Sequence, residues 1–240
     1  MMQYNDYIID FKENFEGSPI ISTVEISKFF SQKKSGLSVN AIRCHIHHLV
    51  EKGVLQRVGR GKYRIGTRKN YYVQIDEDCE KIARSVRGHF PLVDFCIWDT
   101  AELNHLSHYQ SNRHSIVIDV ENGCEEAVWL FLKDANQRVF LKPSAQIVED
   151  YMFMDDKVPL VIERLNSESP MTKLGDYNIP TIEKMLVDIV ANPRLFYQYQ
   201  GDGLRDIINN AFDQYAINVS KLVRYASRRG KKDTILQLLP

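Results

Sequence analysis

The stretch from Leu37 to Gly66 constrains the fold of the first third of the chain more than any other. It reads LSVNAIRCHIHHLVEKGVLQRVGRGKYRIG. Apolar residues recur at helical spacing in its first half, and the buried stripe predicted from them consists of Val39, Ile42, Ile46, Leu49 and Val50. Gly53 is well placed to end this helix, and two short β-type runs follow around a glycine-containing turn. We therefore expect a helix followed directly by a β-hairpin.

Two further helices are predicted upstream of this stretch. Apolar residues follow a helical period over residues 4–15. The run STVEISKFFSQ begins with Ser22 or Thr23 as N-cap and has Glu25 in its first turn, and Ser38 can cap the third helix in the same way. The order helix, helix, turn, helix, hairpin is that of a winged helix-turn-helix.

Charge is segregated along a chain whose formal net charge is zero. Residues 1–70 carry 12 Lys and Arg against 6 Asp and Glu, so the remaining 170 residues carry 19 against 25. This asymmetry predicts a basic module that meets a polyanion, joined to a part that does not. The alternative is a charged face that meets only solvent.

Double-stranded DNA is the polyanion that best fits this pattern. With the apolar stripe facing inward, Asn40, Arg43 and His47 share one outward side of the helix. Asn can pair with adenine and Arg with guanine in the major groove, while basic residues at the hairpin tip and before the helix can contact phosphates. The predicted DNA-binding residues are Lys33, Lys34, Ser38, Asn40, Arg43, His47, Arg57, Arg60 and Lys62. A winged helix used only for protein contacts is the alternative.

The rest of the chain has a different pattern. Between residues 90 and 165, β-rich runs alternate with helical stretches, which predicts an α/β domain with at least partly parallel strands. Residues 166–180 are predicted to be a polar loop. Three helices follow, at 180–191, about 203–215 and about 218–229. The expected fold class is thus α+β or α/β with two domains: a winged helix-turn-helix at 1–70 and a mixed α/β domain at 71–240 with a helical end from about 180.

The cysteines and the apolar runs indicate in which cellular compartment the protein is expected. Four cysteines occur, at positions 44, 79, 96 and 124, without a C-x-x-C pair, which argues for a reducing compartment and against a disulfide framework or a zinc ribbon. No apolar run approaches the roughly 18 residues that a membrane helix needs, and the first residues do not resemble a signal peptide. We expect a cytoplasmic protein.

Three segments resemble a known family. LVEKGVLQRVGRGKYRIG, at 49–66, resembles the N-terminal winged helix of the AbiEi-type antitoxins, which regulate type IV toxin–antitoxin and abortive-infection systems. IPTIEKMLVDIVANPRLF, at 179–196, resembles their x-P-T-x-E-K-x-L-V-D segment, and residues 203–232 resemble their closing helices. The resemblance implies a DNA-binding domain that represses its own operon. It also implies a C-terminal domain that counteracts a nucleotidyltransferase-like toxin, with or without direct contact. Operator palindromes would be met by two copies of the chain.

The C-terminal segments can also be interpreted from their residues alone. In TIEKMLVDIVA, Thr181 is a suitable N-cap, and Glu183 and Asp188 lie off the apolar stripe, where we expect them to make structural polar contacts. A second basic surface, which could meet nucleic acid, an acidic partner or solvent, consists of Lys221, Arg224, Arg228, Arg229, Lys231 and Lys232.

An enzymatic function is the alternative to a DNA-binding regulator. Asp119 and Glu121, with Lys133 and Lys142, resemble the acidic strand and lysine of a metal-dependent nuclease, which a winged helix would direct to nucleic acid. An adjacent E-x-K or D-x-K is missing, and so are phosphate-binding loops and nucleophile motifs. We therefore expect no catalytic residue, no metal and no cofactor. A pure protein-interaction adaptor is the third alternative.

Overall fold

The computed structural model describes the chain in six stretches, at residues 4–33, 36–51, 53–66, 70–108, 111–135 and 138–239. It divides into two compact units. The first unit comprises residues 1–70 together with 214–220, and the second comprises 71–213 together with 221–240.

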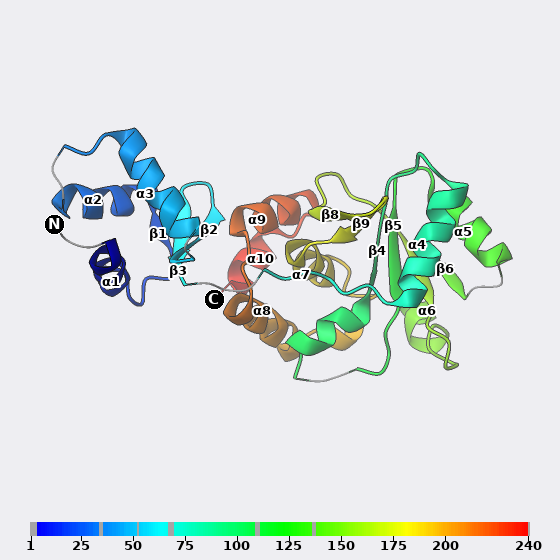
Figure 1. Ribbon diagram of the computed structural model, residues 1–240. Coiled ribbons are helices and arrows are strands. Elements are labelled where there is room, and N and C mark those ends of the chain that lie inside the picture. Colours follow the sequence, from blue (N-terminus) through cyan, green and yellow to red (C-terminus); the bar gives the residue numbers. More distant parts are fainter. Residues whose placement is uncertain are drawn as a thin grey trace. The chain divides into compact units, whose positions relative to one another are not determined.

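The first unit combines helices with a small sheet (Figure 1). Its helices are α1 (Tyr4–Asn14), α2 (Thr23–Lys33) and α3 (Val39–Glu51), and its strands are β1 (Ile21–Ser22), β2 (Leu55–Gly59) and β3 (Lys62–Ile65). The strands lie in the order β1-β3-β2 and pair antiparallel. The three predicted helices and the hairpin are therefore confirmed. Strand β1 was not predicted, because two residues are too few to show an alternation.

Side-chain hydrogen bonds fix the helix starts in this unit. The Glu25 carboxylate accepts a hydrogen bond from the Ser22 backbone N–H at 2.7 Å, and the Ser22 hydroxyl accepts one from the Glu25 N–H at 3.2 Å. This reciprocal pair identifies Ser22 as the N-cap of α2. The Ser38 hydroxyl accepts from the Ala41 N–H at 3.2 Å and caps α3 as predicted. Gly53 follows α3 with a φ of +68°, the conformation that suits a C-terminal cap.

The core of the first unit consists of the aromatic residues of α1 and α2 with the inner stripe of α3. Phe11 packs edge-on against Phe29, with ring centroids 5.2 Å apart. Ile42 and Ile46 of α3 are buried in the same cluster, as the stripe predicted. The prediction was wrong for Val39, which is 66% exposed. It is the first residue of α3, so the inner stripe begins one turn later.

The rest of the chain forms a larger α/β unit. Its helices are α4 (Glu77–His89), α5 (Glu125–Asp134), α6 (Ala145–Asp150), α7 (Ile182–Ala191), α8 (Asp202–Gln214), α9 (Val219–Arg228) and α10 (Lys232–Leu238), with 3-10 helices η1 (Thr100–Leu106) and η2 (Tyr197–Tyr199). Its strands are β4 (Phe95–Asp99), β5 (Ile116–Val120), β6 (Val139–Leu141), β7 (Leu160–Arg164), β8 (Met171–Leu174) and β9 (Tyr177–Pro180). None of the described helices is long and apolar enough to cross a membrane.

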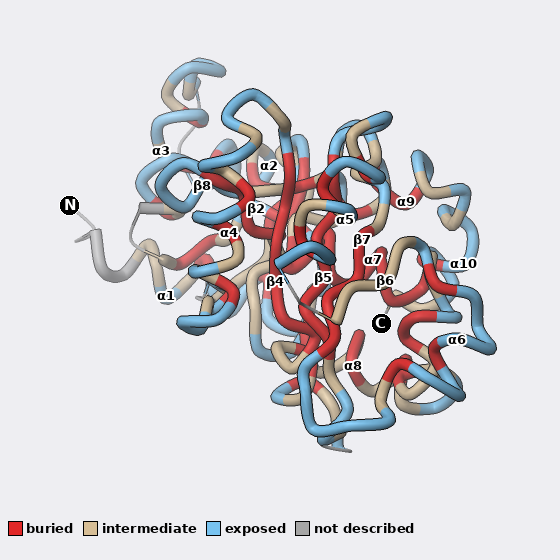
Figure 2. The backbone as a smooth tube through the Cα atoms, turned by 90° about the vertical axis from the view of Figure 1, so that its right-hand side faces the viewer, coloured by how far each residue is buried: buried red, intermediate tan, exposed pale blue. Residues whose placement is uncertain are grey.

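A mixed six-stranded sheet with the order β6-β7-β5-β4-β9-β8 organises this unit. Strands β5, β6 and β7 run parallel, as the alternation of strands and helices predicted, whereas β4 pairs antiparallel with β5. Figure 1 shows α4 and α5 on one side of the sheet and α7 on the other. The central strands β4 and β5 are buried along their whole length (Figure 2).

The prediction of a loop over residues 166–180 was wrong for the second half of this range. Residues 171–180 form the hairpin β8–β9, whose turn contains Gly175 with a φ of +63°. All four residues of β9 are buried because this strand pairs in parallel with β4, through the register Cys96↔Asn178. The Asn178 amide also donates to the Asp94 carboxylate at 2.7 Å and to the Phe95 carbonyl at 3.0 Å. Helix α10 was not predicted either.

Candidate functional site

The outward face of α3 is the first candidate site. Asn40, Arg43 and His47 are all exposed on this helix, and their spacing of three and four residues places them on one side of it. The opposite side carries Ile42 and Ile46, which are buried in the core. The packing therefore leaves these polar side chains on the surface, in the arrangement that the periodicity predicted.

The hairpin β2–β3 supplies a basic tip in the same unit. Arg57, Arg60 and Lys62 are exposed there, and Gly61 makes the turn with a φ of +68°. The Gly61 carbonyl accepts hydrogen bonds from the Thr23 N–H at 2.9 Å and from the Thr23 hydroxyl at 3.2 Å. The turn is thus tied to the first turn of α2, with Arg60 in the turn itself, Arg57 on β2 and Lys62 on β3.

The other predicted contacts near α3 are already engaged or lie outside the described residues. The Lys33 ammonium pairs with the Asp10 carboxylate at 2.5 Å, so part of its charge is neutralised within the unit. The Ser38 hydroxyl caps α3. Lys34 lies outside the residues that the structure describes.

The second predicted basic surface is divided by the structure. Arg224 and Arg228 both pair with the Glu168 carboxylate, the former at 3.4 Å, and Lys232 is exposed. Arg229 instead points inward, with only 16% of its side chain exposed, and pairs with Asp188. Lys231 is half-buried at the start of α10, and Lys221 is half-buried on α9. The structure therefore gathers some of these cations around one acid and places Arg229 in the interior.

A buried charge cluster lies between the sheet and helices α7 and α9. The Lys184 ammonium, whose residue is 0% exposed, contacts the carboxylates of Asp119 and Asp188 at 2.5 Å each. Asp188 also accepts a hydrogen bond from the Tyr225 hydroxyl at 2.9 Å and pairs with Arg229. Two acids and two bases thus compensate one another inside the unit, which is the condition for burying charge.

The buried position perturbs the titration of this cluster. Burial raises the pKa of Asp119 to about 6, although the Lys184 ammonium opposes this rise. Burial favours the neutral amine of Lys184, but the carboxylates of Asp119 and Asp188 outweigh it and hold the pKa of Lys184 well above its ordinary value. Lys184 is therefore charged at neutral pH.

The expectation for α7 needs a correction. Glu183 and Asp188 do lie off the apolar stripe, but every residue from 182 to 190 is buried, because the helix is covered all round. Asp188 makes structural polar contacts, as expected, and Glu183 accepts a hydrogen bond from the Thr181 hydroxyl at 2.5 Å. Thr181 occupies the N-cap position without a side-chain cap hydrogen bond. The importance of Lys184 was missed, although Lys and Asp four residues apart in an apolar helix could have signalled it.

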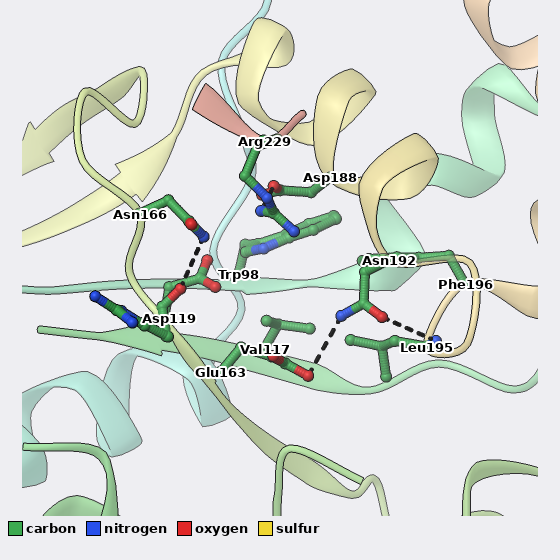
Figure 3. Close-up of a pocket in the computed structure, with 11 residues that line it drawn as sticks. Trp98, Val117, Asp119, Glu163, Asn166, Asp188, Asn192, Leu195, Phe196 and Arg229 are labelled. Atoms are coloured by element: carbon green, nitrogen blue, oxygen red, sulfur yellow. Dashed lines mark hydrogen bonds and ion pairs between the residues drawn. The ribbon is translucent and has the colours of Figure 1, made fainter. Parts of the chain in front are cut away.

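A cavity of about 70 Å³ adjoins the charge cluster (Figure 3). Asp119 of β5 and Glu163 of β7 face it from neighbouring parallel strands, where they are directly in register. Glu163 accepts hydrogen bonds from the Asn192 amide at 3.3 Å and from Arg194 at 2.7 Å. The remaining lining residues are Trp98, Val117, Arg164, Asn166, Asp188, Asn192, Leu195, Phe196 and Arg229.

The residues named for a nuclease do not gather at this cavity or elsewhere in the described chain. Asp119 pairs with Lys184, whereas the exposed Glu121 accepts a hydrogen bond from the Asp94 N–H at 3.1 Å. Lys142 pairs with Glu125 at 2.9 Å, and the Lys133 ammonium lies 4.7 Å from the centroid of a Trp129 ring. Among the described residues, no group of three or more His, Cys, Asp or Glu is placed to hold a metal ion.

Two protein-family models match the chain over overlapping ranges. Residues 41–240 match a family of unknown function (DUF6577), and the chain belongs to this family. Residues 12–66, which contain α2, α3 and the hairpin, match the family described as "Transcriptional regulator, AbiEi antitoxin". The resemblance seen in the sequence of this part is thereby confirmed, and the N-terminal segment is of the AbiEi antitoxin type. Among curated proteins, no match to the chain was found.

Proposed function

We propose that this protein is a DNA-binding transcriptional regulator that serves as the antitoxin of a type IV toxin–antitoxin system. It represses its own operon and counteracts a nucleotidyltransferase-like toxin. One observation carries the proposal: the segment of the AbiEi antitoxin type, residues 12–66, carries both the exposed polar face of α3 and the basic hairpin. The charge of the first 70 residues supports a nucleic acid as the partner.

In this proposal the first unit acts as a winged helix-turn-helix. Helix α3 enters the major groove, where Asn40 and Arg43 meet base edges, and His47 lies further along the same side. Arg60 at the braced hairpin tip contacts the phosphate backbone. Residues 1–70 are then the DNA-binding domain, and residues 71–240 form the α/β domain with a helical end that opposes the toxin. Two copies of the chain meet a palindromic operator.

Fluorescence anisotropy tests the DNA-binding part. The full chain is titrated with the duplex upstream of its own gene and with a scrambled duplex, each across a range of salt concentrations. We expect tight binding to the upstream duplex, with a steep fall in affinity as salt rises, because each neutralised phosphate releases counterions. Equal, weak binding to both duplexes would refute specific repression.

Two variants separate base recognition from phosphate contact. Arg43→Ala should weaken upstream binding by about 1–3 kcal/mol and relax the sequence preference, because a bidentate pair with guanine would be lost. Arg60→Ala should weaken binding to both duplexes alike. It should also reduce the slope of log affinity against log salt concentration by about 0.9, the value of one phosphate contact. Lys157→Ala removes an exposed positive charge from the second unit and should change neither quantity.

Toxin antagonism is tested separately in cells. The adjoining nucleotidyltransferase-like gene is induced with the wild-type chain or with Arg43→Ala, both expressed from an unrelated promoter. We expect both to restore growth, since the proposal assigns antagonism to residues 71–240. Rescue by the wild type alone would show that DNA binding, and not the second unit, relieves toxicity.

A further inference from the structure

One residue that lines the cavity of the second unit carries an unsatisfied hydrogen-bond donor. Trp98 lines it and is 1% exposed, yet its indole Nε1 has no hydrogen-bond partner among the described residues. A buried donor without an acceptor costs roughly 1–3 kcal/mol, so such groups call for an explanation. Trp129 offers a contrast, because its indole N–H donates to the Val139 carbonyl at 3.3 Å. An acceptor bound beside Trp98 would satisfy this donor.

Unused acceptors face the same space. Asp119 contacts Lys184 through Oδ2, and Glu163 accepts its hydrogen bonds through Oε1. Within the part of the chain that the structure describes, Oδ1 of Asp119 and Oε2 of Glu163 accept none. Figure 3 shows Trp98, Asp119 and Arg229 around this space, with Glu163 and Asn192 at its other end. A ligand would therefore meet donors and acceptors together.

The charges around the cavity favour a neutral ligand. Three carboxylates line it, those of Asp119, Glu163 and Asp188, together with the guanidinium groups of Arg164 and Arg229. Lys184 pairs with both Asp119 and Asp188, and Arg194 pairs with Glu163. An anion would approach three carboxylates, and a cation would approach two guanidinium groups, so either would be desolvated at a cost.

We propose that this cavity binds a carboxamide group, which presents a carbonyl acceptor beside N–H donors and carries no charge. The carbonyl oxygen accepts from the Trp98 indole and from Arg229, and the amide N–H groups donate to Asp119 and Glu163. The volume agrees with this choice, because about 70 Å³ is roughly half of the ~150 Å³ cavity that admits the six heavy atoms of benzene, and it therefore suits about three heavy atoms, the number in a carboxamide group. The inference concerns the second unit alone and does not depend on DNA binding.

The carboxamide can belong to a free small molecule or to a protein side chain. Arg164 and Asn166 line both this cavity and an open cleft of about 570 Å³, which continues past Ser167 and Ser169. A glutamine side chain of a partner could reach the cavity through this cleft. The chemistry that the cavity recognises is the same for both sources.

Nuclear magnetic resonance of the full chain tests the proposal. The two tryptophans give two indole N–H signals, which Trp98→Phe and Trp129→Phe assign. Acetamide is titrated against acetate and acetamidinium, which have the same shape but carry opposite charges. We expect acetamide to shift the Trp98 signal saturably and to leave the Trp129 signal in place, with at least about fivefold weaker binding of both ions. A glycine-glutamine-glycine peptide that binds about tenfold tighter than acetamide would identify a protein side chain as the source, and equal or weaker binding would identify a small molecule.

Two variants complete the test, with binding followed through the Asn192 side-chain amide. Trp98→Phe removes the donor but keeps an aromatic ring in place. It should weaken the binding of acetamide about fivefold, the value of one hydrogen bond. Trp129→Phe is the matched control and should bind as the wild type does. The proposal is overturned if acetamide causes no saturable shift, if either ion binds as tightly, or if the two variants have equal affinity.

Discussion

Replacing Lys184 with Met tests how the second unit tolerates its buried charges. The ammonium contacts Asp119 and Asp188 at 2.5 Å each, and both carboxylates are 93% buried by side-chain area. Met fills a similar volume without charge, so the change isolates the electrostatic effect. Breaking a buried pair by removing one partner typically costs about 3–5 kcal/mol, because the other charge stays desolvated. A protein whose stability is about 5–15 kcal/mol would lose a large part of it.

Urea unfolding at pH 8 and pH 5 measures this loss and checks its cause. The folded-state pKa of Asp119 is raised to about 6 from 3.8, so this carboxylate destabilises the folded state increasingly as pH rises through its folded pKa. Without Lys184 the pKa should rise further, and at pH 5 Asp119 would be neutral. We therefore expect Lys184→Met to cost about 3–5 kcal/mol at pH 8 and clearly less at pH 5, with a fall in Tm of about 6–20 °C at pH 8.

The control is Lys173→Met, which removes an exposed charge on β8 and should change stability by less than about 0.5 kcal/mol. A loss below about 1 kcal/mol for Lys184→Met at pH 8 would refute the claim that Lys184 compensates two buried acids. An equal loss at both pH values would show that packing, and not charge, explains it.

Three further predictions concern single positions. His114 lies 2.8 Å from the Asp99 carboxylate, and this hydrogen bond raises the pKa of the imidazole above 6.5, so its stabilisation is complete below pH 6.5 and is lost as pH rises through the folded pKa. In His114→Gln, the free energy of unfolding measured in urea should depend less on pH across that interval, and a pH dependence equal to that of the wild type would contradict this. Gly61→Ala should destabilise the first unit by about 1–2 kcal/mol, because its φ is +68°, and a neutral effect on its thermal unfolding would show that the turn relaxes. Ile42→Ala should cost about 2–5 kcal/mol and Val39→Ala less than about 0.5, so equal losses would mean that the exposure of Val39 is misassigned.

Local patterns in the sequence predicted the first unit well. Each of its helices is amphipathic, and Gly53 and Gly61 occupy positions with positive φ that end a helix and make a turn. The outward position of Asn40 and Arg43 follows from the same periodicity, so this candidate surface could be predicted from the sequence. The error at Val39 has a physical reason, since periodicity gives the direction of a side chain but not where the neighbouring core ends.

The second unit was harder to predict because its key contacts are distant in sequence. Strand β9 lies in a stretch rich in turn formers, and its pairing with β4 makes it a strand. In the charge cluster, Lys184 of α7 pairs with Asp119 of β5, and Arg229, which follows α9, pairs with Asp188 of α7. The spacing of Lys184 and Asp188 is a local signal, but nothing local places Asp119 or Arg229 beside them, and Arg229 was therefore grouped with the basic residues around it.

The pairing of β4 with β9 has a consequence for the order in which the sheet assembles. Cys96 and Asn178 are 82 residues apart, so bringing them together costs about 4 kcal/mol of loop-closure entropy before any contact is gained. The hairpins β4–β5 and β8–β9 close much shorter loops and can form earlier. The two hydrogen bonds of the Asn178 amide then stabilise the pairing of β4 with β9, which forms last. Substitutions at Asn178 should therefore accelerate unfolding more than they slow folding.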